Sequence, residues 1–181
     1  DNDFYGTVFS AKYEKDKVNL IIGGGWNSYK GDHFGEVIWA RFAGNSMIRD
    51  RYYDDDSKKT DFNMFGKINY EISEKWRLFG DLQFRTVSYM ANGEDTGIVD
   101  DTFNFFNPKL GVTYDLNSKN NLYLSYAVAN REPNRNDYEN GNPKPERLND
   151  LELGWRYVSP SVQVSTNVYY MRYKDQLVLT G

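Results

Sequence analysis

The sequence predicts an all-β fold, an antiparallel up-and-down meander of about eight long strands. Three observations support this prediction. Apolar and polar side chains alternate with a period of two over long stretches, and such a period places successive side chains on opposite faces of a strand. The connections between these stretches alternate between short and long, and aromatic residues gather beside the short ones.

Composition narrows the class of protein. The chain has 181 residues, a formal net charge of −4 and no cysteine. This length suffices for one domain with a sizeable core, and the acidic balance argues against a nucleic-acid-binding protein. Without cysteine, neither disulfides nor thiolate chemistry is available. No apolar run approaches the ~20 residues of a membrane helix. This criterion does not detect transmembrane β-strands, because their sequence pattern is an alternation of apolar and polar residues.

The alternating stretches give the expected strands in order. The clearest pair turns at Ser73–Lys75, and its second member carries charges at every second position, as at Arg77, Asp81 and Arg85. Charges in such a row must face water, because an unpaired charge is costly in a dry core. We expect strands over residues 3–14, 18–29, 61–72, 76–90, 103–116, 121–129, 148–158 and 161–173.

Three long polar connections are expected at residues 30–60, 91–102 and 130–147. The first contains His33, the only histidine, and a short alternating piece at residues 36–42. The third begins where Pro133 removes a ladder donor and restricts the residue before it. Brief turns at one end and long loops at the other are typical of outer-membrane barrels.

Aromatic placement favours the same class. Five aromatic residues stand on the apolar face within a few residues of a short turn, where an interfacial girdle of a membrane barrel would lie. Spanning a bilayer takes ~9–11 residues per tilted strand, and the expected strands reach that length. A soluble barrel or sandwich would instead turn its apolar faces inward, and alternation alone leaves this alternative open. The five expected lipid-interface residues are Tyr13, Tyr70, Trp76, Tyr114 and Tyr157.

No catalytic constellation is visible, so we expect a protein that is not an enzyme, and we assign no cofactor and no metal ligand. The acidic run at residues 54–56 matches no calcium loop and is expected to be a solvated loop. Arg131, Arg135, Asp137 and Tyr138 lie where a strand leaves the wall on the long-loop side, so we expect them to contact a ligand. Paired arginines suit an anionic ligand. The alternative is that they pair with Glu132, Glu146 and Asp150 to hold the loop.

Several segments resemble the barrel of TonB-dependent outer-membrane receptors. Their amino-acid sequences are similar to those of receptors of the Bacteroidetes group. They are residues 129–134 (Ala-Asn-Arg-Glu-Pro-Asn), 142–146 (Asn-Pro-Lys-Pro-Glu) and 151–154 (Leu-Glu-Leu-Gly). The resemblance implies a 22-stranded barrel with an N-terminal plug domain inside. It further implies import of an extracellular small-molecule ligand (a ferric siderophore, cobalamin or a glycan) with energy from the TonB complex.

We therefore expect residues 1–181 to be part of a receptor barrel in the bacterial outer membrane, with lipid on one face and water on the other. The expected partners are outer-membrane lipid, the extracellular ligand and the TonB complex through a plug domain that this sequence lacks; nucleic acid is not expected. Both ends look cut, the second within an expected strand at residues 177–181. The alternatives are a complete eight-stranded outer-membrane barrel with a structural or adhesion role, and a soluble ligand-binding β-barrel.

Overall fold

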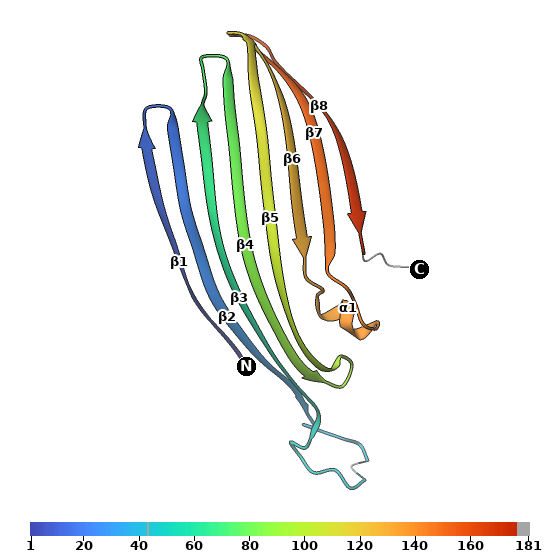
Figure 1. Ribbon diagram of the computed structural model, residues 1–181. Coiled ribbons are helices and arrows are strands. Elements are labelled where there is room, and N and C mark those ends of the chain that lie inside the picture. The colour runs from blue at the N-terminus through green and yellow to red at the C-terminus, as the bar shows by residue number, and fades with distance from the viewer. Residues whose placement is uncertain (43, 177–181) are drawn as a thin grey trace.

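The computed structural model describes residues 1–42 and 44–176, which form one antiparallel sheet. The strands lie side by side in the order of the sequence, so the predicted meander of eight strands is confirmed (Figure 1). The expected strand at residues 177–181 lies outside the described residues. The elements are β1 (Asn2–Lys15), β2 (Val18–Glu36), β3 (Arg51–Glu71), β4 (Trp76–Gly93), β5 (Gly97–Asn117), β6 (Asn120–Arg131), α1 (Arg135–Glu139), β7 (Glu146–Val158) and β8 (Gln163–Lys174).

The strands are longer than the sequence predicts at one end of the sheet. We call it the loop end, because it carries the connections β2–β3, β4–β5 and β6–β7 (Figure 1). The expected long loop at residues 91–102 is wrong: β4 runs to Gly93 and β5 starts at Gly97, whose φ of +66° suits a tight turn. The expected loop position of His33 is also wrong, because β2 extends past it and His33 pairs with Asp55 of β3.

The extra length of these strands was not predicted from the sequence, for a physical reason. Alternation is visible only where one face of a strand is apolar, and near the loop end both faces of β4 and β5 carry polar groups. On the outer face, Thr86 donates to Asn104 across 2.9 Å, and the hydroxyls of Ser88 and Thr102 are also 2.9 Å apart. The strands therefore continue with no periodic pattern of hydrophobicity. The short alternating piece at residues 36–42 is not a strand beyond Glu36, and it belongs to the connection between β2 and β3.

The two faces of the sheet differ in chemistry. One face carries an apolar band that includes Leu78, Leu82 and Phe84, which are 41%, 50% and 45% exposed. The intervening side chains of β4, such as Arg77 and Arg85, make ion pairs on the opposite face. We call these the outer and the inner face.

The sheet is curved (Figure 1). Glu132, just after β6, contacts Lys59 of β3 at 2.7 Å, although β4 and β5 lie between these two strands. Such a contact requires the intervening strands to bend around it, since neighbouring strands are about 4.8 Å apart. The polar face is thus the concave one. A soluble barrel would place its apolar face there instead.

The sheet is open. β1 and β8 are its edges, and among residues 1–42 and 44–176 no strand pairing joins them. The described residues therefore form a segment of a barrel wall and not a closed eight-stranded barrel. No helix in the described ranges has the length and apolar character that a membrane crossing requires.

The few buried apolar side chains of the described residues lie toward the loop end. Val87 is completely buried, and Phe105 is stacked on Phe103 with ring centroids 6.0 Å apart. A second cluster joins Ala91 and Val99 to Tyr138 of α1. The helix therefore completes the small core of the sheet at the end where ligand-binding residues were expected.

Candidate functional site at the loop end

The connection between β6 and β7 folds back on itself. Asn134 caps α1: its side-chain oxygen accepts from the Asp137 amide at 3.1 Å, and the Asp137 carboxylate accepts from the Asn134 amide at 2.8 Å. Such a reciprocal capping box satisfies two amides that the first turn of a helix leaves free. Pro133, directly before the cap, ends the regular pairing of β6. The local sequence thus encodes a strand end followed at once by a helical turn.

Tyr138 attaches this turn to the inner face. Its side chain is 7% exposed, packs against Ala91 and Val99, and lies 5.5 Å from the ring of Tyr89. Its hydroxyl donates to the Asp101 carboxylate at 2.8 Å. A buried tyrosine hydroxyl needs such a partner, because an unpaired polar group in a core is costly. Burial and this hydrogen bond raise the pKa of Tyr138 above its ordinary value.

Arg135 links α1 to β3. Its guanidinium donates to Asp55 at 3.0 Å and to Glu139 at 3.2 Å. The second oxygen of Asp55 accepts from the Glu94 amide in the β4–β5 turn at 3.0 Å. One carboxylate therefore ties together the helix, the start of β3 and a turn. The charge of Arg135 is neutralised by these two acids.

Glu132 is the centre of a second network. Its carboxylate accepts from both terminal nitrogens of Arg85, at 2.8 and 2.9 Å, and from Lys59 at 2.7 Å. Arg85 also donates to Asp61 at 2.9 Å. The Glu132 side chain is only 9% exposed. The network brings residues of β3, β4 and the end of β6 together, and forked hydrogen bonds of this kind are among the strongest in proteins.

The network sets the ionisation of Glu132. Burial of the carboxylate raises its pKa, but the hydrogen bonds from Arg85 and Lys59 outweigh this effect and lower the pKa of Glu132 to about 2. Glu132 is therefore charged at any physiological pH. It acts as an anchor of the connection, since a group that is fully ionised and already paired cannot exchange protons with a ligand near neutral pH.

A recess of about 370 Å³ opens beside α1. Its walls come from the end of β2, the start of β3, the β4–β5 turn and the helix. Two adjacent tyrosines contact each other edge to face with ring centroids 5.2 Å apart. In the described ranges, no group of three or more histidine or acidic side chains is arranged to hold a metal ion. The lining residues are His33, Tyr52, Tyr53, Asp55, Glu94, Asp95 and Arg135.

The structure separates the four residues expected to contact a ligand. Only Arg135 lines the recess. Arg131 pairs with Glu146, its cross-strand neighbour, at 3.3 Å, whereas Asp137 caps α1 and Tyr138 is buried. The alternative role, in which these residues hold the loop, is thus visible in their contacts. The partners are Glu146, Asp55, Glu139 and Asp101, and Glu132 and Asp150 are not among them.

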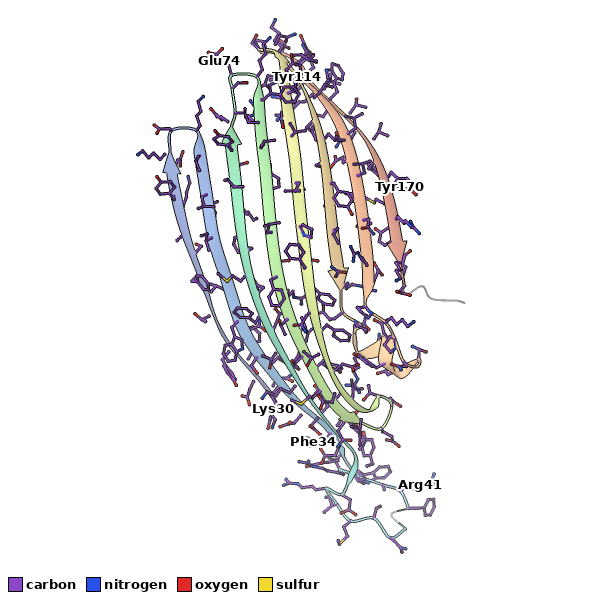
Figure 2. The ribbon with its side chains drawn as sticks, viewed as in Figure 1. Lys30, Phe34, Arg41, Glu74, Tyr114 and Tyr170 are labelled. Carbon is purple, nitrogen blue, oxygen red and sulfur yellow. The ribbon has the colours of Figure 1, made fainter. Side chains whose placement is uncertain are left out.

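Sequence reasoning missed most of the recess. His33 and Asp55 belong to segments read as loop, although their cross-strand pairing places them together on the inner face. A usable signal was present in the even spacing of Asp55, Lys59 and Asp61, which continues the polar face of β3 toward its start. Figure 2 shows that the same end of the sheet carries Phe34, over which Arg51 lies at 3.9 Å.

The five aromatic residues expected at a lipid interface lie on the outer face beside the short turns. Figure 2 shows Tyr114 at that end of the sheet, near Glu74 of the β3–β4 turn. Trp76 and Tyr114 are cross-strand partners with ring centroids 4.5 Å apart. Tyr70 pairs with Val18, and Tyr13 pairs with Leu20. Tyr157 completes the set beside Trp155 at 6.5 Å. Their contact with lipid stays a prediction.

Residues 1–181 match the family model described as TonB dependent receptor-like, beta-barrel. The chain belongs to this family. The curved sheet, with its polar inner face, thus corresponds to part of a TonB-dependent receptor-like barrel. No curated protein matches the sequence.

Solved structures of this family's fold resemble the chain at low sequence identity. The copper transporter OprC is 16% identical with a TM-score of 0.76, over 94% of this chain and 29% of that one. The FrpB iron transporter from Neisseria meningitidis is 15% identical with a TM-score of 0.71, over 97% and 29%. The ferric citrate transporter FecA is 16% identical with a TM-score of 0.67, over 95% and 28%. The chain thus spans less than a third of the length of these proteins.

Proposed function

We propose that this chain is part of the wall of an outer-membrane receptor that binds an extracellular ligand at the loop end and imports it. One observation carries the proposal: the concave inner face is polar and ion-paired, whereas the convex outer face is an apolar band. A wall of this kind suits lipid outside and water inside. The recess beside α1 lies on the wet side, where a solute would meet Arg135 and its neighbours.

The partners follow from this placement and from the family. Outer-membrane lipid contacts the apolar band and the aromatic row that includes Trp76 and Tyr114. Energy for import comes from the TonB complex, through a plug domain that the described residues do not contain. The motifs at residues 129–134 and 151–154 support a receptor of the Bacteroidetes group. The role is transport and not catalysis.

Of the expected ligand classes, a glycan fits the recess best. The acids Glu94 and Asp95 make no ion pair with any described residue, and Arg135 is already neutralised by Asp55 and Glu139. An anionic ferric siderophore would therefore meet net negative charge. Carboxylates accept hydrogen bonds from hydroxyl groups, and the rings of Tyr52 and Tyr53 offer flat apolar surface for a sugar.

The two alternatives have less support. A complete eight-stranded barrel with an adhesion role requires pairing of β1 with β8, which the described residues do not show. A soluble ligand-binding barrel requires an apolar interior, but the interior side here carries Arg85, Lys59 and Glu132. The soluble alternative also leaves the exposed aromatic row on the outer face unexplained.

Uptake by cells tests the proposal. Cells that express the full-length receptor should import a fluorescent neutral oligosaccharide only when TonB is present, and Glu94→Gln with Tyr53→Ala should reduce binding at least tenfold. The matched control is Glu74→Gln in a short turn at the opposite end, which should leave binding unchanged. Recovery of the protein in the aqueous fraction after lysis without detergent would overturn the membrane placement. Uptake of a ferric siderophore in place of the sugar would overturn only the ligand class.

A further inference from the structure

Three cations gather on the outer face of β7 and β8 toward the loop end. Arg147 and Lys174 are direct cross-strand neighbours, and Arg172 lies one pleat away, opposite Asn149. Alternate residues of a strand share a face, so all three side chains leave the sheet on the side of the apolar band. They are separate from the recess beside α1, which lies on the inner face.

These cations have no partner among the described residues. Arg147, Arg172 and Lys174 make no ion pair or hydrogen bond through their side chains with any residue in the ranges 1–42 and 44–176, whereas Arg85 and Arg135 each engage two carboxylates. Three like charges on adjacent strands repel one another, and like charges directly opposite destabilise a sheet. Such an arrangement calls for a counter-charge from outside the described residues.

The cluster stands directly beyond the apolar band. Along β7, Trp155, Leu153 and Leu151 face outward and are 38%, 53% and 45% exposed, and the next outward positions are Asn149 and Arg147. Along β8, Val168 and Tyr170 precede Arg172 and Lys174 in the same way. The stretch from the short turn to Tyr170 approaches the ~9–11 residues that cross a bilayer. The cations therefore lie at the level of lipid headgroups.

An open depression of about 670 Å³ lies where the three cations adjoin the apolar band. Its apolar part is formed by Leu151 with the rings of Tyr126 and Tyr170, the last of which is labelled on β8 in Figure 2. Its polar part is formed by the three cations with Asn149, which accepts a hydrogen bond from Tyr126 at 2.9 Å. A charged rim above an apolar floor suits an amphipathic molecule.

We propose that this depression binds the phosphate-bearing headgroup of a membrane lipid, with its acyl chain lying along Leu151 and Tyr170. The two guanidinium groups match phosphate oxygens with forked hydrogen bonds, and Lys174 adds a point charge. The other outer-face cations near the loop end are different. Lys30 and Lys58 are cross-strand partners, but Asp32 pairs with Lys30 and lies opposite Asp56. The proposal rests on the proposed membrane placement.

Lipid retention by the full-length receptor in detergent micelles tests the site, read by native mass spectrometry. The probes are dioleoyl phosphatidic acid, dioleoylglycerol with the same chains and no phosphate, and inorganic phosphate as a competitor. Arg147→Gln with Arg172→Gln should weaken retention of phosphatidic acid about 30-fold, the effect of two cations near an anionic lipid. The matched control, Lys30→Gln with Lys58→Gln, removes the same charge from the same face and should change retention less than threefold.

The results of this experiment distinguish a specific lipid site from general electrostatic attraction, and both from a failure of the proposed membrane placement. Equal losses in both double variants would reduce the effect to general attraction and overturn the site, as would displacement of the lipid by inorganic phosphate at equal concentration. Arg172→Lys keeps the charge but loses the forked hydrogen bonds, so it should weaken retention less than Arg172→Gln does, and an equal or larger loss would count against the site. A receptor that inserts into membranes but retains phosphatidic acid and dioleoylglycerol alike refutes this inference alone. A protein that needs no detergent refutes the proposed function as well.

Discussion

Cations on the two faces of the sheet meet opposite situations near the loop end. On the inner face, Arg85 and Lys59 share the carboxylate of Glu132, and Arg135 is held by Asp55. On the outer face, Arg147 and Arg172 have no acidic partner among the described residues. The difference teaches that charge on this wall has two uses. Inside, charges fix the β6–β7 connection to β3 and β4; outside, no described residue neutralises them, which is the basis of the proposed lipid site.

Removing the inner acceptor should have the largest effect. Glu132→Ala leaves Arg85 and Lys59 without their shared carboxylate, and removing one partner of a largely buried ion pair costs about 3 to 5 kcal/mol. Urea unfolding of the full-length receptor in micelles measures this change. Glu146→Ala is the matched control, because the exposed Arg131–Glu146 pair should contribute no more than about 1 kcal/mol. Similar losses in both variants would contradict the central role of Glu132.

Lowering the pH should gradually remove the contribution of the Glu132 carboxylate to the free energy of unfolding. The pKa of Glu132 falls from 4.5 to about 2 in the folded protein, so its stabilisation is fully present above about pH 4.5 and is lost as the pH falls toward 2. Unfolding midpoints measured across this range should decline more steeply for the native receptor than for Glu132→Gln, which cannot titrate. Parallel slopes would show that other acids control this range.

A charge placed on each face should next distinguish lipid from water. Leu82→Arg puts a cation in the middle of the outer apolar band and should cost about 2 to 4 kcal/mol in a membrane. The neighbouring Gln83→Arg points inward, where it sacrifices the hydrogen bond from Asn107 and should cost about 1 kcal/mol. Folding into phosphatidylcholine vesicles, followed by the mobility shift of the folded barrel, reports both. Equal tolerance of the two substitutions would reverse the assignment of faces.

A smaller effect is expected at Tyr138. Tyr138→Phe keeps the packing on Ala91 and Val99 but leaves Asp101 without its donor, which should cost about 1 kcal/mol. Limited proteolysis of the β6–β7 connection should speed up accordingly. Tyr126→Phe is a control of the same kind on the outer face, and it should leave the rate of cleavage unchanged.

The smallest change in stability is expected for the outer cations. Arg172→Gln breaks no contact among the described residues and relieves repulsion with Lys174, so unfolding should shift by less than about 0.5 kcal/mol. A loss above 2 kcal/mol in the same urea measurement would show that Arg172 has a structural partner, and the contrast between the two faces would fail.

The strands that cross the apolar band were predictable because each has one apolar face. Trp76, Leu78 and Leu82 alternate with charged or polar residues, and that period of two suffices to place β4 and its neighbours. The extensions of β2 and β3 past residues 29 and 61 were not predictable in this way. There His33 and Asp55 lie on strands whose two faces both carry polar residues, so hydrophobicity shows no period of two.

The sequence by itself determined the meander and the two-faced strands, because local alternation and turn residues set the direction of each side chain, and the motifs at residues 129–134 and 151–154 carried the resemblance to the family. It left open which face is concave and which charges meet. Those points were decided by the curvature of the sheet, which brings Glu132 within 2.7 Å of Lys59 across two intervening strands. The contacts of the four residues expected to bind a ligand were decided for the same reason, and ligand contact stays a prediction. Their partners Asp55 and Asp101 are distant in sequence, and only the folded sheet places them beside α1.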